Sequence, residues 1–152
     1  MKIVKLNSDR IHRIGIRLNG PSDIDYILSN WFRRVRPCVS MSDDELNDHK
    51  RDVFMAVLRR CGASVACHPS YPEQIFGFAI GEVQRETPVV HFVFVKGGPY
   101  RRCGIATAVL QDALGGRLGT PGKFTYQTRQ AKFMVKKWNL EFDPYRVAWG
   151  DR

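Results

Sequence analysis

The sequence predicts an α/β protein of the α+β type, in which helices flank a central β-sheet. Residues 22–62 show the apolar spacing of helices, whereas residues 64–96 are rich in β-branched and aromatic residues between turn signals. Residues 89–95 are apolar almost throughout, which is typical of a central strand covered on both faces. A chain of 152 residues can bury one core, and we expect a single domain over residues 1–152.

The first part of the chain predicts one strand and two helices. Residues 14–18 alternate as a half-buried strand does. Ser22 is the expected N-cap of a first helix, which Pro37 would end. A second helix is expected to begin with the capping box at residues 42–45 and to end at Cys61 and Gly62.

Strand and helix signals alternate in the rest of the chain, and glycines or prolines separate them. The expected elements are strands at 64–67, 75–83 and 89–96, a helix from Gly104 to Gly115, a strand at 124–128, a helix at 129–138 and a strand at 145–149.

The charge balance favours anionic partners. There are 24 Lys and Arg residues against 15 Asp and Glu, a formal net charge of +9. Nucleic acid or another acidic partner is therefore one expectation, and a solvated basic surface is the alternative. We see no apolar run that could span a bilayer and no signal peptide, so we expect a cytoplasmic protein without a membrane partner.

Cysteine spacing gives no sign of a metal site. Cys38, Cys61, Cys67 and Cys103 form no CxxC pair, and no second paired cluster completes a zinc set. We expect reduced cysteines and no bound metal.

The most informative segment is residues 93–106, which predict a buried strand, a basic turn with glycines and a helix. Backbone N–H groups and the positive end of a helix dipole would meet there, an arrangement that suits a phosphate or diphosphate. Gly104 lacks a Cβ and permits close approach of the backbone, while Arg101 and Arg102 add charge. An ordinary connection with exposed arginines is the alternative. The spacing of a P-loop is absent from the sequence.

Residues 101–106, Arg-x-x-Gly-x-Ala, resemble the acyl-CoA diphosphate loop of the GNAT (GCN5-related) N-acetyltransferases, and the order of elements is similar across nearly the whole chain. The resemblance implies a mixed, mostly antiparallel sheet whose central strands splay apart. It also implies an enzyme that takes acetyl-CoA as acyl donor, needs no metal, and transfers the acetyl group to an amine acceptor. Finer sequence similarities resemble small phage and prophage members, which would act in the host cytoplasm.

The same resemblance implies how the donor is held. Backbone groups of Phe94, Val95 and Lys96 would pair with the pantetheine arm. The diphosphate would be held by Arg101, Arg102, Cys103, Gly104, Ile105 and Ala106. The amine would then attack the thioester directly, which calls for a base, a polarised carbonyl and an acid for the thiolate.

Two residues are candidates for the base. His91 is expected on the strand face of Val93 and Val95, near the place where many relatives carry a glutamate base, and imidazole titrates near neutral pH. A hydrogen-bonded core histidine is the alternative. Glu82, near the end of the preceding strand, is the other candidate, and a solvated carboxylate is its alternative.

The acid is the point at which the sequence departs from the family, because residues 131–138 contain no tyrosine. Tyr145 and Tyr126 are the substitutes that we consider, each with a packed aromatic as its alternative. Two further functions stay open, a nucleic-acid-associated protein on this scaffold and a protein that binds CoA without turnover. The family also permits a homodimer.

Overall fold

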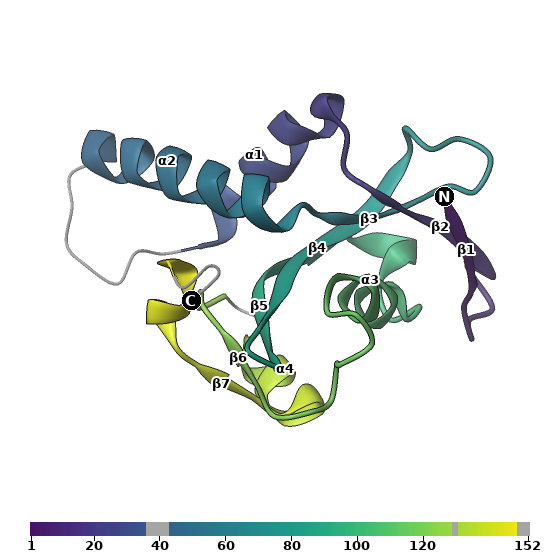
Figure 1. Ribbon diagram of the computed structural model, residues 1–152. Coiled ribbons are helices and arrows are strands. Elements are labelled where there is room, and N and C mark those ends of the chain that lie inside the picture. Colours follow the sequence, from purple (N-terminus) through teal and green to yellow (C-terminus); the bar gives the residue numbers. More distant parts are fainter. Residues whose placement is uncertain (36–42, 129–130, 149–152) are drawn as a thin grey trace.

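The computed structural model describes residues 1–35, 43–128 and 131–148 (Figure 1). Its elements in chain order are β1 (Lys2–Lys5), β2 (Arg13–Leu18), η1 (Pro21–Asp23), α1 (Ile24–Arg34), α2 (Asp43–Cys61), β3 (Ser64–Cys67), β4 (Ile75–Gln84), β5 (Thr87–Val95), η2 (Gly98–Tyr100), α3 (Ile105–Ala113), β6 (Gly122–Phe124), α4 (Ala131–Trp138), β7 (Leu140–Phe142) and η3 (Pro144–Ala148). None of the helices described is long and apolar enough to cross a membrane.

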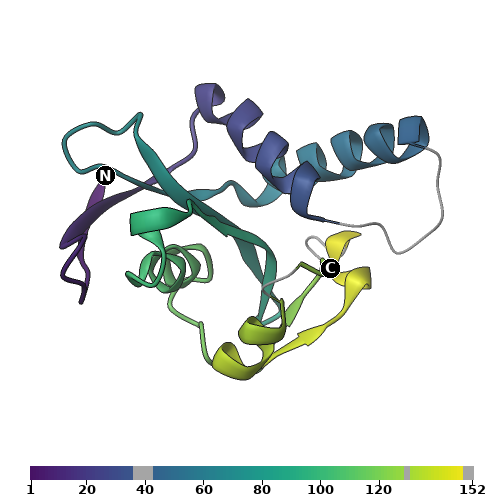
Figure 2. The same cartoon turned by 180° about the vertical axis from the view of Figure 1, so that it is seen from behind.

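The seven strands form one sheet whose spatial order is the order along the chain. Strands β1 to β5 pair antiparallel with their neighbours, and β6 and β7 continue the sheet in parallel with β5. Helix α3 lies on one face, and α1 and α2 lie on the other (Figures 1 and 2). The predicted class, a mixed and mostly antiparallel sheet flanked by helices, is confirmed.

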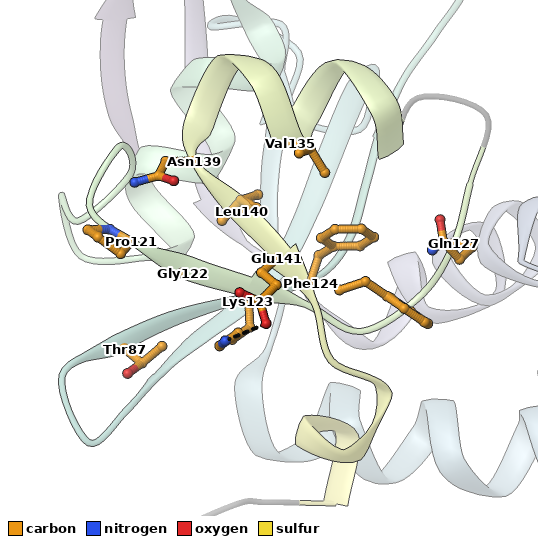
Figure 3. A pocket seen from close by; sticks show the side chains of 11 residues that line it. Thr87, Pro121, Gly122, Lys123, Phe124, Gln127, Val135, Asn139, Leu140 and Glu141 are labelled. Carbon is orange, nitrogen blue, oxygen red and sulfur yellow. Dashed lines mark ion pairs between the residues drawn. The ribbon is translucent and has the colours of Figure 1, made fainter.

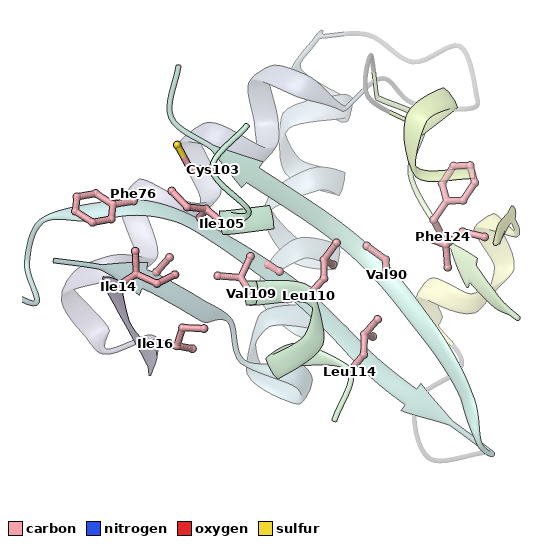
Figure 4. Close-up of a cluster of buried hydrophobic side chains, with 13 residues drawn as sticks. Ile14, Ile16, Phe76, Val90, Cys103, Ile105, Val109, Leu110, Leu114 and Phe124 are labelled. Carbon is pink, nitrogen blue, oxygen red and sulfur yellow. The ribbon is translucent and has the colours of Figure 1, made fainter. Parts of the chain in front are cut away.

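Each face of the sheet carries a hydrophobic core. On one face, the apolar residues of α3, among them Val109 and Leu110, pack on Ile14 and Ile16 of β2 (Figure 4). On the other face Trp31 is fully buried and stacks on Phe54 of α2, with ring centroids 3.8 Å apart. The spacing of apolar residues in both helices reflects this burial.

Strands β5 and β6 are neighbours that pair over only part of their length. Strands β5 and β6 pair only through Val89 with Lys123 and Val90 with Phe124, and the N–H of Thr125 donates to the carbonyl of Val90 at 3.1 Å. Strand β5 continues to Val95 without a further strand partner on that edge among the described residues. The predicted splay is therefore present, and it leaves an open backbone edge beside the basic loop.

A β-bulge in β5 corrects the expected orientation of His91. Phe92 pairs with Ile80 and Val90 pairs with Gly81, so β5 carries one extra residue, His91, at this place. The side chain of His91 consequently turns to the face of α2, where it meets Glu82, and not to the face of Val93. Simple alternation along a strand cannot foresee this inversion.

Several elements differ from those that the sequence predicts. Strand β1, a four-residue edge strand, was not predicted. The sequence also predicts strands at 124–128 and 145–149, where the structure has β6 at Gly122–Phe124 and a 3₁₀ turn at Pro144–Ala148. The last strand is β7, which begins directly after α4. Ser22 lies inside the 3₁₀ turn η1 and does not cap α1. The expected capping residue Ser42 lies outside the described residues.

A pair of glycine substitutions tests the close contact between β4 and β5. A Cβ on Gly77 would collide with the carbonyl oxygen of Phe94, whereas a Cβ on Gly97 would meet no atom within 4 Å. We expect Gly77→Ala to lower the free energy of unfolding by about 1–3 kcal/mol, because the backbone of a packed sheet must move. Gly97→Ala is the matched control and should leave stability within about 1 kcal/mol of wild type. Urea denaturation measures both, and equal effects would contradict the packing.

Candidate functional site

The loop between β5 and α3 leaves a run of backbone N–H groups without acceptors among the described residues. After the 3₁₀ turn η2, Arg102 and Gly104 both adopt positive φ angles, +58° and +89°, and α3 begins at Ile105. For the N–H groups of residues 102–107 the described part of the chain provides no acceptor. Gly104 is needed here because few other residues adopt a φ of +89° without strain. These donors, together with the N-terminus of α3, make the loop suited to a phosphate.

Two of the predicted loop residues have buried side chains. The Cys103 side chain is buried, and its thiol donates to the carbonyls of Pro99 and Arg101 at 3.2 and 3.4 Å. Ile105 is buried in the core beneath α3. Because both side chains are buried, they fix the loop on the core beneath α3.

Two arginines far from the loop in sequence lie beside it, and sequence reasoning missed both. One guanidinium N–H of Arg10 donates to the carbonyl of Arg101 at 2.7 Å. The guanidinium of Arg34 lies 4.5 Å from the ring centroid of Phe94 and donates to Asn30. In the sequence, Arg10 belongs only to an exposed turn and Arg34 only to a basic helix end. Neither pattern indicates that the residue lies near the loop.

The loop is electrostatically uncompensated. Burial, and then the positive charges of Arg33 and Arg101, lower the pKa of Arg34 from its ordinary value. Within the described residues no carboxylate pairs with any of the cations around the loop, namely Arg10, Arg34, Lys96, Arg101 and Arg102. Such a concentration of positive charge, with arginine forks included, favours a multiply charged anion.

Among the three residues expected to pair with pantetheine, the backbone orientations differ. The N–H of Lys96 donates to the carbonyl of Phe76 in β4, at 2.9 Å. Backbone groups alternate in direction along a strand, so those of Phe94 also face β4, and those of Val95 face the open edge. Val95 is therefore the one of the three whose backbone is directed at the splay.

Glu82 and His91, both candidates for the base, belong to one hydrogen-bonded chain that joins α2, β4, β5 and the residue after β6. His91 Nε2 lies 2.6 Å from Glu82 Oε2, and His91 Nδ1 lies 2.8 Å from the hydroxyl of Thr125, just after β6. Arg60 of α2 bonds the same carboxylate at 2.7 Å, and the Cys61 thiol donates to it at 3.0 Å. The structure thus brings the two candidates together at the point where β5 and β6 separate.

The protonation states follow from these contacts. Burial lowers the pKa of His91 despite the opposing effect of Glu82, so the imidazole is neutral at pH 7. Nε2–H then donates to Glu82, and Nδ1 accepts from Thr125. Burial alone would raise the pKa of Glu82, but hydrogen bonds from His91, Arg60 and Cys61 outweigh it and lower the pKa to about 2. Glu82 is an ionised carboxylate, and both nitrogens of His91 are occupied.

Ligand atoms of Cys61, Glu82 and His91 lie within 4.8 Å of one another, close enough to hold a metal ion. The guanidinium of Arg60 already bonds this carboxylate and would repel a cation. Burial also raises the pKa of the Cys61 thiol, which disfavours the thiolate that a metal needs. Cys61, Glu82 and His91 are therefore better suited to a network of hydrogen bonds and charges with Arg60 than to a metal site.

The hydrogen-bonded network around Glu82 predicts that the folded protein loses stability in acid. The folded-state pKa of Glu82 is lowered from 4.5 to about 2, so its contribution to stability is full above pH 4.5 and is lost as the pH falls through about 2. We expect wild type to lose more stability than Glu82→Gln between pH 5 and pH 2.5 in urea denaturation. Asp9→Asn, which alters an exposed carboxyl, is the control and should follow wild type. Parallel curves for wild type and Glu82→Gln would contradict the lowered pKa.

Neither of the two tyrosines considered as the general acid lies where a proton donor is needed. Tyr145 lies in η3 with 85% of its surface exposed. Tyr126 packs edge-on against Trp31 and Phe54, with centroids 5.7 and 5.2 Å apart. Tyr126 is a packed aromatic residue, which was the alternative for it. For Tyr145, the contacts among the described residues bring no reacting group near its hydroxyl.

Two hollows of about 800 and 790 Å³ indent the surface. The first lies between α4 and strands β6 and β7, over the ion pair of Lys123 with Glu141, and no candidate residue lines it (Figure 3). The second borders the basic loop and includes Lys96, Tyr100 and Tyr26. Of the predicted site residues, only Lys96 lines either hollow.

Two basic helices that could contact nucleic acid, α1 and α4, differ in their surroundings. In α1 Trp31 is buried and Phe32 packs on the core, as an amphipathic helix requires. In α4 Phe133 is 72% exposed, and Lys136 and Lys137 are exposed as well. Helix α1 therefore offers no exposed tryptophan on which a nucleic-acid base could stack. The expectation of a nucleic-acid partner stays a prediction.

Comparison with known proteins gives weak similarities. No protein-family model matches the sequence, and no curated protein sequence matches it. A structure from Pyrococcus furiosus with a provisional acetyltransferase assignment is similar over 66% of this chain and 71% of its own, with 18% identity and a TM-score of 0.46. An acetyltransferase structure from Trypanosoma brucei is similar over 91% of this chain and 92% of its own, with 17% identity and a TM-score of 0.38. Similarities at this level say nothing about substrate or reaction.

Proposed function

We propose that the protein is an acyl-CoA-dependent N-acyltransferase that transfers acetyl from acetyl-CoA to an amine. The observation that carries the proposal is the loop at residues 101–106, where unpartnered N–H groups, a helix N-terminus and exposed arginines meet. The similarity of this loop to the GNAT diphosphate loop supports the same assignment.

The residues around the loop fit the donor. Backbone donors of residues 102–106 and the guanidinium of Arg101 bind the diphosphate, and the open edge at Val95 binds the pantetheine amide. The thioester then lies between β5 and β6, where the strands separate. Positive charge around the loop holds the donor in one orientation, with its thioester directed toward the network of Glu82 and His91.

The acceptor nitrogen attacks the thioester carbonyl carbon, a C–N bond forms, and the C–S bond breaks to release the thiolate of CoA. The nitrogen must also lose a proton. We assign this proton to the network of Glu82 and His91, because Glu82 is ionised and Arg60 Nε, at 3.2 Å, is the only partner of its Oε1 among the residues that the structure describes. His91 and Arg60 position this carboxylate.

Isothermal titration calorimetry with acetyl-CoA tests the proposal. We expect saturable binding with a dissociation constant in the micromolar range, and we expect affinity to weaken with salt because the contacts are charged. Protein that is folded by circular dichroism but binds no acetyl-CoA at high micromolar ligand would overturn the proposed function.

A CoA-binding protein without turnover is the second candidate. It is favoured by the occupied nitrogens of His91 and by the exposed position of Tyr145, because neither side chain is then arranged to exchange a proton at the splay. Release of free thiol from acetyl-CoA in the presence of a panel of amines separates the two. Binding without thiol release would support the second candidate.

A further inference from the structure

We infer that Arg10, which lies 91 positions before Arg101, binds the phosphate at the adenosine end of the acyl donor. This inference rests on the proposed function and extends it to a segment outside the diphosphate loop. It assigns the turn between β1 and β2 as the part of the chain that recognises a third phosphate group beyond the diphosphate.

The turn that carries Arg10 is fastened in place. The N–H of Leu6 donates to the carbonyl of His12 at 2.7 Å, which closes the turn, and the Ser8 hydroxyl accepts from the N–H of Arg10 at 3.2 Å. Leu6 and Ile11 pack on the core beneath α3. Leu6 also lies beside Gly104, because a Cβ on that glycine would be 3.9 Å from Leu6 Cδ2. The turn therefore borders the N-terminus of α3.

Arg10 is held in one orientation and keeps N–H donors for a ligand. One of its five N–H bonds is spent on the carbonyl of Arg101, and the described residues supply no acceptor for the other four and no carboxylate partner. The side chain is exposed and stands beside a loop whose own N–H groups are unpartnered. An arginine fixed at one end, with its remaining donors exposed, is arranged to bind an anion.

Arg10 and Arg34 flank the loop on opposite sides. Arg34 belongs to α1 and contacts Phe94, on the sheet face of α1 and α2 and near the splay. The turn of Arg10 packs with the core of α3, on the other face. Because Arg10 bonds the loop itself and Arg34 contacts the strand before it, the end of the donor beyond the diphosphate is assigned to Arg10. That end carries the 3′-phosphate, which dephospho-CoA lacks.

A double-mutant cycle between protein and ligand tests this contact. Dissociation constants for CoA and dephospho-CoA are measured calorimetrically with wild type, Arg10→Met and the control Arg13→Met, which removes an exposed arginine of β2. Methionine keeps an unbranched apolar stem and removes the charge. We expect wild type and Arg13→Met to bind CoA about 10-fold or more tightly than dephospho-CoA. Arg10→Met should bind the two ligands equally, with the dephospho-CoA affinity of wild type.

The alternatives are distinguishable. If Arg10→Met weakens both ligands by the same factor, Arg10 supports the loop or binds the diphosphate, and the inference is wrong. Equal affinity of wild type for the two ligands also overturns it, while leaving the proposed function intact. If wild type binds neither ligand, the proposed function itself fails, and the assignment of Arg10 fails with it.

Discussion

Replacing Arg101 by Glu together with Gly104 by Asp is expected to abolish acetyl-CoA binding. The first change reverses a charge next to the N–H donors, and the second places a carboxylate at a position with φ +89° where the diphosphate would lie. A hydrogen bond to a charged group contributes about 1.5–3 kcal/mol, and 1.4 kcal/mol is tenfold in affinity. Together the two changes should raise the dissociation constant by about 100-fold or more, as measured by calorimetry.

Two controls separate charge from folding and from backbone strain. Arg59→Glu makes the same charge reversal at an exposed position of α2 and should leave affinity within about twofold of wild type. Gly104→Ala keeps the charge and strains the backbone, so it isolates the need for a left-handed residue at the start of α3. If the double variant is folded and binds acetyl-CoA like wild type, the site has been placed on the wrong loop.

The loop could be predicted from sequence because its information is local. Strand, turn glycines and helix start follow one another within residues 93–106, and hydrophobic periodicity is enough to order them. Gly104 was expected for close approach of a ligand, and its φ of +89° adds a conformational reason for the same residue. The inward direction of Cys103 and Ile105 could not be read from the pattern, because it depends on the core beneath α3.

The network around Glu82 could not be assembled from sequence. His91 was expected on the face of α3, and one extra residue in β5 turns it to the face of α2. Bulges have no fixed sequence signature, and the hydrogen bonds of the network join residues 9 to 34 positions apart in the chain, from Arg60 to Thr125. Long-range contacts of this kind arise from sheet register, which local periodicity does not specify.

The position of Arg10 illustrates the same limit on a surface. In the sequence it is one of 24 Lys and Arg residues, with no local feature to single it out. Pairing of β1 with β2 folds the intervening turn toward α3, and β1 itself was not predicted. Part of the net charge of +9 thereby gains a local explanation at the loop.

Replacing Glu82 by Gln is expected to slow acetyl transfer by about 100-fold to 10,000-fold in kcat, the range for loss of a positioned proton acceptor, with acetyl-CoA affinity unchanged. The amide keeps the shape of the side chain but cannot accept a proton. A carboxylate with a pKa of about 2 is a weak base, but the ammonium formed when the amine attacks the carbonyl carbon is a stronger acid than the ammonium of the free acceptor. The proposal therefore places proton loss to Glu82 after the attack and not before it, and Arg60 and His91 hold the Glu82 carboxylate in place.

The measurement must distinguish chemistry from stability, since Glu82→Gln also weakens a buried network by about 1–3 kcal/mol. Thiol release is therefore followed at a temperature where circular dichroism shows the variant folded, and acetyl-CoA affinity is measured on the same preparation. His91→Asn is the companion variant: if His91 only positions Glu82, kcat should fall less than in Glu82→Gln, with the same pH dependence as wild type. A folded Glu82→Gln protein with wild-type kcat would show that the network is structural and that the acceptor amine loses its proton elsewhere.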